Sequence, residues 1–437
     1  MEGSRYATAE ELARLGVPED FKNPLVLVFK MVSDNGANMK AAWQDDAARW
    51  VPCADHTLEL CTLPVTWVKK HKGQDDKIHP GSIAEAYAHG RGLVGYLRVS
   101  PNAAHDFREA QAKCQLPQVT INQDVKTRWR TAHDMGEQLC TNKAAIMELD
   151  KNPSYKAPGE TWGKNKLTMT MWDYLDEGTA VLAEAAKASQ ILEGDLYPTS
   201  SLVVPMVYAI MASSSPLVSV KFQNRADDEF NDASLNPVRV PHDELTPKVQ
   251  VARKAYHERL IKYFDSEVAM TVKKFWFISS MLDVRFKKLA FKNDRMLTPL
   301  MRRNAVKWLT EEFNRHYKGK LNSKTTASDS KTTASGEAVA RQLHVKRRKT
   351  STADFFAGSS DSDSDDSEQE APAKDELQAY LELPQVKCAT EQEALNWWRD
   401  RTLTSSLQLG SDDTVVLGSW AALRPRLPWN ASFLRSA

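Results

Sequence analysis

The sequence predicts the fold class α/β plus mostly α: a short α/β segment followed by a long helical block. An apolar run at residues 25–33 stops at Asp34-Asn35-Gly36, which is typical of a central strand that ends in a tight turn. Helical periodicity then dominates from about residue 82 to residue 318. A polar stretch at 319–372 separates this block from a short helical pattern near the C-terminus.

Length, composition, net charge and cysteine count limit the possible classes of protein. The 437 residues correspond to two or three domains at about 150 residues per domain, and a hydrophobic fraction of 42% is enough for a sizeable core. A net charge of +1 neither favours nor excludes nucleic acid, because local clustering of charge matters more. Five cysteines without a CxxC pair give no disulfide framework and indicate reduced thiols in a cytosolic or nuclear protein.

No membrane partner is predicted. The N-terminal residues 1–16 are charged and lack the apolar stretch of a secretory signal. Residues 196–220 carry no charge, but they include three prolines and six serines around a short apolar centre. That composition favours a buried helix over a membrane span.

The first elements alternate between helix and strand. We expect a helix at 8–15, the strand at 25–33, a helix at 37–48, a short strand at 49–53 and a helix at 54–71. Four later stretches have helical stripes, strong helix formers or a Thr-Pro start, and they predict the main helices of the block. These stretches are 127–149, 171–195, 246–265 and 297–317.

The segment 319–372 is predicted to be a disordered linker, because it holds too few apolar residues to offset chain entropy. It repeats SKTTAS and ends in an acidic serine-rich run that resembles kinase sites. Between these, Lys346, Arg347, Arg348 and Lys349 form a basic run that predicts nuclear import.

Several residues are candidates for chemistry, each with a structural alternative. Asp34, at the end of a strand, is placed to hold Mg²⁺, although Asp-Asn-Gly also makes a turn without any ligand. Cys53 and His56 are half of a zinc site by spacing, or else a buried thiol and a hydrogen-bonded imidazole. Arg128 and Trp129 are placed to contact phosphate and base, or else Trp129 packs in the core.

A second basic stretch, LDVRFKKLAF, offers Arg285, Lys287 and Lys288. These side chains are either a DNA-binding patch or a solvated helix face. DNA binding predicts that Arg128 and these three residues lie on one basic surface.

Taken in order, seven motifs resemble those of the hAT superfamily of DNA transposases, of the BED-finger-associated type. They are VSDNGANM, VPCADHTLEL, DVKTRWRTAHDM, LYPTSSLVVPMVYAI, MLDVRFKKLAF, DELQAYL and ALNWWRD. The resemblance extends from about residue 20 to about residue 400. It implies an RNase H-like core interrupted by a large all-helical insertion.

The resemblance divides the chain into five parts. These are a partial RNase H-like core without its first strands at 1–130, the helical insertion at 131–318, the linker at 319–372, a partial dimerisation segment at 373–401 and an unassigned tail at 402–437. Self-association, or association with related hAT chains, is then expected through the C-terminal segment. The residues that carry it are Leu377, Tyr380, Leu381, Leu395, Trp397 and Trp398.

The resemblance also assigns roles to the candidate residues. Asp34 matches the second acid of the family's Asp-Asp-Glu site, and Cys53 and His56 match a Cys-x-x-His element beside it, which is not a zinc finger. Arg128 and Trp129 match an Arg-Trp pair in which the tryptophan is associated with stacking on an extruded base.

Two of the family's three acids have no match in this sequence. No strand that ends in aspartate precedes Asp34, and Glu393 is the last glutamate, before the position at which the catalytic glutamate is expected. One carboxylate cannot position two metal ions. We therefore expect a truncated, catalytically inactive, nuclear, transposase-derived protein that binds DNA or other chains, with no small-molecule cofactor and no metal.

Three alternatives remain open. An active transposase or nuclease would bind Mg²⁺ at Asp34 and complete its acidic site from another chain, or from Asp124. A protein-interaction module would expose an apolar stripe on its C-terminal helices. A decayed fragment would fold with an incomplete sheet.

Overall fold

The computed structural model describes most of the helical block and part of what flanks it. The described residues are 30–44, 50–66, 81–125, 128–152, 161–194, 199–222, 238–324, 376–386, 393, 394, 396 and 397. The expected helix at 8–15, the first five residues of the strand at 25–33, the basic run at 346–349 and the tail at 402–437 lie outside them.

A small parallel sheet and two helices begin the described part. The strands β1 (Met31–Ser33) and β2 (Trp50–Pro52) pair in register, with Val32 opposite Val51. The helix α3 (Ala37–Ala42) connects them, and α4 (Ala54–Thr66) follows β2 directly. The predicted order of strand, helix, strand and helix is confirmed, and both helices are described over shorter spans than predicted.

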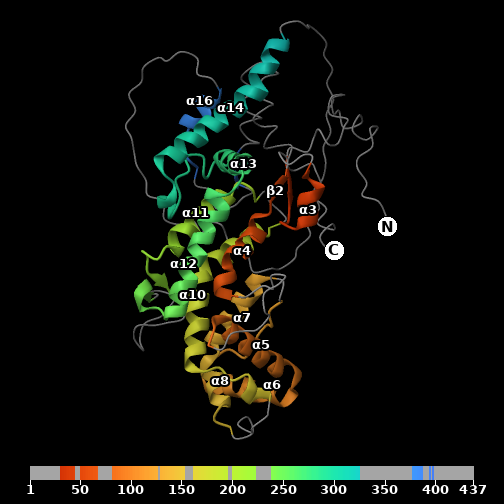
Figure 1. Ribbon diagram of the computed structural model, residues 1–437, viewed down its shortest axis with the longest axis vertical. Helices are drawn as coiled ribbons and strands as arrows, with labels where there is room; N and C mark the ends of the chain where they lie inside the picture. Colours follow the sequence, from red (N-terminus) through yellow and green to blue (C-terminus); the bar gives the residue numbers. More distant parts are fainter. Residues whose placement is uncertain are drawn as a thin grey trace, which may run out of the picture.

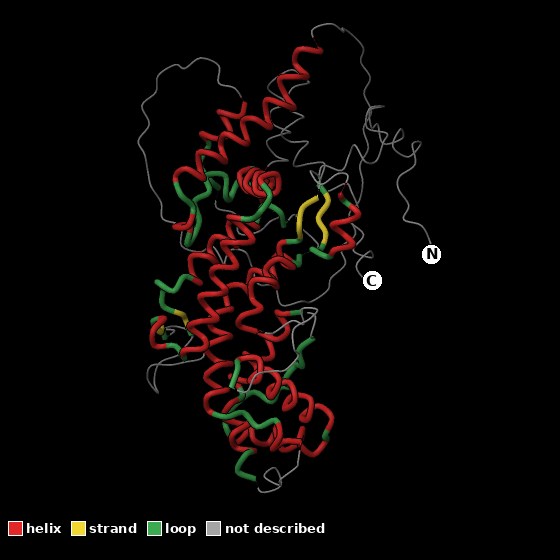
Figure 2. Tube along the Cα trace, in the orientation of Figure 1, coloured by secondary structure: helices red, strands yellow, loops and turns green. Residues whose placement is uncertain are grey.

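Helices make up most of the rest, as Figure 2 shows. From residue 81 to residue 222 they are α5 (Ile83–Val99), α6 (Pro101–Lys113), α7 (Trp129–Thr141), α8 (Lys143–Leu149), α9 (Thr161–Lys164), α10 (Met169–Leu192) and α11 (Val203–Ser214). Side chains of Ser82, Ser100 and Thr168 accept hydrogen bonds from the first turns of α5, α6 and α10, so local sequence sets these three starts.

A second set of elements begins with two short antiparallel strands. The set comprises β3 (Val220–Lys221), β4 (Arg239–Val240), the 3₁₀ turn η4 (His242–Glu244), α12 (Pro247–Ile261), the π-helical turn η5 (Lys262–Ser266), α13 (Met270–Met281), the 3₁₀ turn η6 (Asp294–Met296), α14 (Pro299–Lys324) and α16 (Glu376–Glu382). The helix α14 continues six residues beyond the predicted end of the block at 318.

The 24-residue helix α10 is the central helix of the described part of the chain. It packs against α4, α5, α7, α11 and α12, and one continuous apolar core joins these helices. The contact with α7 is close: a Cβ on Gly136 would lie 2.8 Å from Cγ2 of Thr179, so only glycine fits there.

Figure 1 shows how the parts are arranged in space. The helices α14 and α16 lie at one end, α6 and α8 lie at the other, and β2 and α3 lie beside the upper half of the helical stack. The helix α11 is buried on nearly all sides, as the uncharged stretch at 196–220 predicted. None of the described helices has the length and apolar character that crossing a membrane requires.

The described part of the chain is therefore mostly helical, with two sheets of two strands each. A helical RNase-like domain is consistent with this architecture. Two short parallel strands do not confirm the partial RNase H-like core that we expected at 1–130.

Candidate functional site

Asp34 lies at the end of β1 and is exposed. Its Oδ1 atom accepts a hydrogen bond from the backbone N–H of Gly36 at 3.0 Å. A Cβ on Gly36 would lie 2.9 Å from that same oxygen, so a larger residue there would displace the Asp34 side chain. The carboxylate therefore holds the turn that leads into α3, in keeping with the structural alternative for this motif.

Cys53 lies beside Asp34, because its backbone N–H donates to the carbonyl oxygen of Ser33 at 2.7 Å. Burial raises the pKa of the Cys53 thiol, and the charges of Asp55 and Asp34 add to that effect. His56 contacts Glu59 in the same helix, with 3.3 Å between Nδ1 and Oε2. The thiol of Cys53 is thus mostly removed from solvent, and the imidazole of His56 has a partner. Both observations favour the structural alternative over half of a zinc site.

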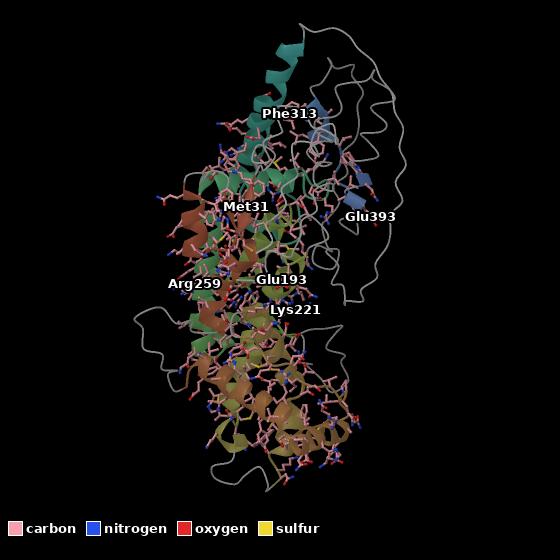
Figure 3. The ribbon with its side chains drawn as sticks, turned by 90° about the vertical axis from the view of Figure 1, so that its right-hand side faces the viewer. Met31, Glu193, Lys221, Arg259, Phe313 and Glu393 are labelled. Carbon is pink, nitrogen blue, oxygen red and sulfur yellow. The ribbon has the colours of Figure 1, made fainter. Side chains whose placement is uncertain are left out.

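A cluster of charged and polar side chains connects the starts of α4 and α7 to the end of α10. We call Asp55, Arg130, Asp134, Ser189 and Glu193 the acid–arginine cluster. Ser189 of α10 donates a short hydrogen bond to Oδ1 of Asp55 and lies 3.5 Å from Oε1 of Glu193. Figure 3 labels Glu193 at mid-height of the molecule, below Met31 of β1.

Arg130 pairs with two of the three acids of this cluster, Glu193 and Asp134. Its Nε and NH2 donate to the two carboxylate oxygens of Glu193 at 3.2 Å and 3.1 Å, and its NH1 donates to Asp134 at 3.1 Å. Burial raises the pKa of Asp55 to about 6, the hydrogen bond from Ser189 lowers it, and the charge of Glu193 raises it again. A forked arginine–carboxylate pair of this kind is a strong contact that leaves few lone pairs for a metal ion.

Sequence reasoning missed Asp55 and Glu193. Asp55 is within the Cys-x-x-His motif, in which only Cys53 and His56 were predicted to have a role. Glu193 follows Ser189 by one helical turn, which carries no signal until α4 and α7 are placed beside the end of α10.

Arg128 and Trp129, predicted to bind DNA together, differ in their exposure to solvent. Arg128 is exposed just before α7, whereas Trp129 begins the helix with only 7% of its surface exposed. Its indole Nε1 has no hydrogen-bond partner among the described residues. The predicted stacking on a base therefore does not fit this conformation, since the ring packs in the apolar core.

The predicted basic surface at 285–288 is not present as such. Arg285 is buried and forms a fork with Asp283, at 3.0 Å from Nε to Oδ1 and 2.8 Å from NH2 to Oδ2. Lys287 is 2% exposed and donates to the carbonyl oxygen of Tyr380 at 2.7 Å. Of these three basic residues, Lys288 alone is exposed. Arg128 and the three residues therefore do not form the one basic surface that was predicted. The physical reason is that buried charges require partners within the protein.

The C-terminal segment at 376–386 packs against the part of the same chain around Lys287. The hydroxyl of Tyr380 donates to the carbonyl oxygen of Met281 at 2.7 Å, and Val386 N–H donates to the carbonyl oxygen of Val284 at 3.1 Å. Leu377 and Tyr380 are buried, Leu381 is half-buried and Trp397 contacts the ring of Tyr380. The exposed apolar stripe that an interaction module would show is therefore absent from 376–386. Leu395 and Trp398 lie outside the described residues.

Asp124, the substitute acid considered from the sequence, is also engaged. Arg91 of α5 donates to both of its carboxylate oxygens, from Nε at 2.6 Å and from NH2 over a shorter distance. Among the described residues, one group of three potential metal ligands has its ligand atoms together, namely His105, Asp106 and Glu109 on α6. Asp34 is not part of it.

The comparisons with known proteins agree with the helical part of this description. Residues 51–176 match the family model of the ZBED1 RNase-like helical domain. A search of the curated proteins gave no match. From β2 to the first turns of α10, the chain is therefore similar to the ZBED1 RNase-like helical domain, which is consistent with a hAT/ZBED-type origin.

Proposed function

We propose that this chain is a hAT transposase-derived nuclear protein that has kept a binding role and lost strand transfer. The match to the ZBED1 RNase-like helical domain supports the origin. The motifs outside the matched range, at the end of β1 and from α11 to α16, resemble the same superfamily.

The observation that carries the proposed loss of catalysis is the state of the acids around Asp34. Asp34 and Asp55 lie close enough to Cys53 that both charges raise the pKa of its thiol. Asp55 accepts from Ser189, and Glu193 is paired with Arg130. A two-metal site needs several carboxylates whose oxygens converge on the ions, and an arginine among them opposes metal binding electrostatically.

DNA is the partner that we propose, contacted from the start of α7. Arg128 is exposed there, whereas the neighbouring Arg130 is engaged with Glu193. An exposed arginine contributes mainly to phosphate contacts, which give affinity that falls with salt and little sequence preference.

The experiment measures salt-titrated binding of the purified chain to hairpin, single-stranded and duplex DNA, with Mg²⁺ and a nicking assay in parallel. We expect binding that weakens steeply with salt, weakens further in Arg128→Ala and occurs without nicking. The matched control is Arg108→Ala, an exposed arginine on α6. Equal affinity for the wild type and Arg128→Ala would contradict the proposed contact.

A second candidate is an active nuclease that completes its acidic site from another chain. The exposure of Asp34 favours it, because a second chain could reach that carboxylate. Mg²⁺-dependent nicking that Asp34→Asn abolishes would establish this candidate and overturn the proposed loss of catalysis.

A further inference from the structure

The stretch from residue 284 to residue 310 is strongly basic. It holds eight lysine and arginine residues and one acid, Asp294, although the whole chain has a net charge of only +1. Arg285 and Lys287 are buried with partners inside the protein, so neither is available to a binding partner. The basic residues of the stretch that are exposed are Lys288, Lys292, Arg295, Arg303 and Lys307.

Arg302 joins the loop at 288–294 to the first turn of α14. Its NH1 donates to the carbonyl oxygen of Lys288 at 3.3 Å and to that of Leu289. Its NH2 donates to Oδ2 of Asp294 at 2.7 Å. One guanidinium group therefore holds both ends of the loop against α14 and pairs with the single acid of the stretch.

The backbone of this loop is tightly folded. Leu289 and Asn293 have φ angles of 51° and 62°, in the left-handed region. A leucine in this conformation costs about 1–3 kcal/mol, and such conformations are common at functional sites. The side chain of Leu289 is buried in the core, which holds the strained residue in place. The loop thus keeps Lys288 and Lys292 close to the start of α14.

Three exposed cations surround the contact between the loop and the helix. We call Lys288, Lys292 and Arg303 the loop–α14 surface. Within the described part of the chain none of the three forms an ion pair, whereas Lys307, one turn further along α14, lies 3.9 Å from Glu311. The start of α14 adds the positive end of a helix dipole. Positive charge concentrated in this way, without acids to compensate it, attracts a polyanion.

We propose that the loop–α14 surface is a second contact for the phosphate backbone of duplex DNA. The inference rests on the proposed function, which has its own DNA contact at Arg128 before α7. Figure 1 shows α14 at one end of the helical stack and α7 in its other half, so the two contacts are separate. Phosphate contacts need positive charge and not a match to base edges, so this surface adds affinity without sequence preference.

The test is the salt dependence of duplex binding by the full chain. The logarithm of the association constant falls linearly with the logarithm of salt concentration, and each phosphate contact contributes about one unit to the slope. The double variant Lys292→Gln with Arg303→Gln should therefore reduce the slope by about two units. The control, Arg108→Gln with Lys254→Gln, removes the same charge from exposed positions on α6 and α12 and should keep the wild-type slope.

The outcomes separate this surface from the contact at Arg128. A wild-type slope in the Lys292/Arg303 variant, together with weaker binding in Arg128→Ala, would overturn the surface and leave the proposed function standing. An equal fall of the slope in the control variant would show general attraction and overturn the surface as well. No DNA binding by the wild type would overturn both. Weaker binding of poly-glutamate at an unchanged DNA slope would assign the surface to an acidic protein instead.

A chemical measurement on the wild type is independent of these variants. Lysines are acetylated with and without duplex DNA, and the modified positions are quantified by mass spectrometry. DNA should protect Lys288 and Lys292 but not Lys254, which is exposed on α12. Equal modification of Lys288 and Lys292 with and without bound DNA would overturn the proposal.

Discussion

Asp55 is an acid whose burial opposes its ionisation. It is largely buried at the start of α4, and its pKa is raised to about 6 by burial and by Glu193. An acid with a raised pKa binds its proton more tightly in the folded chain than in the unfolded chain. Its contribution to the free energy of unfolding is therefore complete at low pH and is lost as the pH rises through about 6.

Asp55→Asn should make the protein more stable above that pH. A shift from 3.8 to about 6 corresponds to about 3 kcal/mol of destabilisation by the ionised group at pH 8, and the amide can still accept from Ser189. Urea unfolding at several pH values between 5 and 8 measures the effect. Asp34→Asn, at an exposed carboxylate, is the control, and a wild-type pH slope in Asp55→Asn would contradict the prediction.

At the scale of single elements, the short helix α16 depends on contacts far away in the sequence. Seven residues form a marginal helix in water, so packing rather than propensity stabilises it. Lys287 donates to the carbonyl oxygen of Tyr380 and lies 4.8 Å from the centre of its ring. Residues that were predicted to bind DNA and to mediate dimerisation thus contact each other.

Lys287→Met should release α16 and lower the free energy of unfolding by about 2 kcal/mol, because it removes a buried, charge-assisted hydrogen bond. Amide hydrogen exchange across 376–386 measures the release. The matched control is Lys288→Met, at the exposed neighbour, for which we expect a change within about 0.5 kcal/mol. Equal effects of the two variants on DNA affinity and on exchange would instead favour the basic surface predicted from the sequence.

At the scale of the whole molecule, α10 holds the two sets of helices together. Glu177, buried in the middle of α10, accepts from the backbone N–H of Thr246 at 2.9 Å and from its hydroxyl at 2.8 Å. Thr246 is the residue before α12, so a carboxylate from one helix caps the start of another. One continuous core joins these helices, so we expect them to unfold as one unit.

Glu177→Ala should therefore weaken the whole unit and not α12 alone. The expected loss is about 2 kcal/mol, for a removed cap and a donor left without its partner. Helical circular dichroism and the fluorescence of the buried tryptophans, among them Trp172 on α10 and Trp276 on α13, should shift together. Glu184→Ala is the control: this half-exposed acid of the same helix makes one surface ion pair, with Lys187 at 3.6 Å, and its loss should leave both midpoints nearly unchanged.

Most of the helices and strands form where local sequence signals predict them. The turn at Asp34, the Thr-Pro starts and the apolar stripes are local signals, and helices with capping residues follow from them. The structure agrees with the predicted helix–strand order around 30–66 and with the long helical block. These features need only a residue and its neighbours within one or two turns.

The surroundings of the charged and aromatic residues depend on how distant segments pack. A sequence shows that Trp129, Arg285 and Lys287 can contact nucleic acid, but not whether packing buries them. It shows Asp55 and Glu193 as separate acids, 138 positions apart, and not that Arg130 and Ser189 join them. Burial and pairing arise from contacts between distant segments, so the chemistry of each charge was settled only when the helices packed.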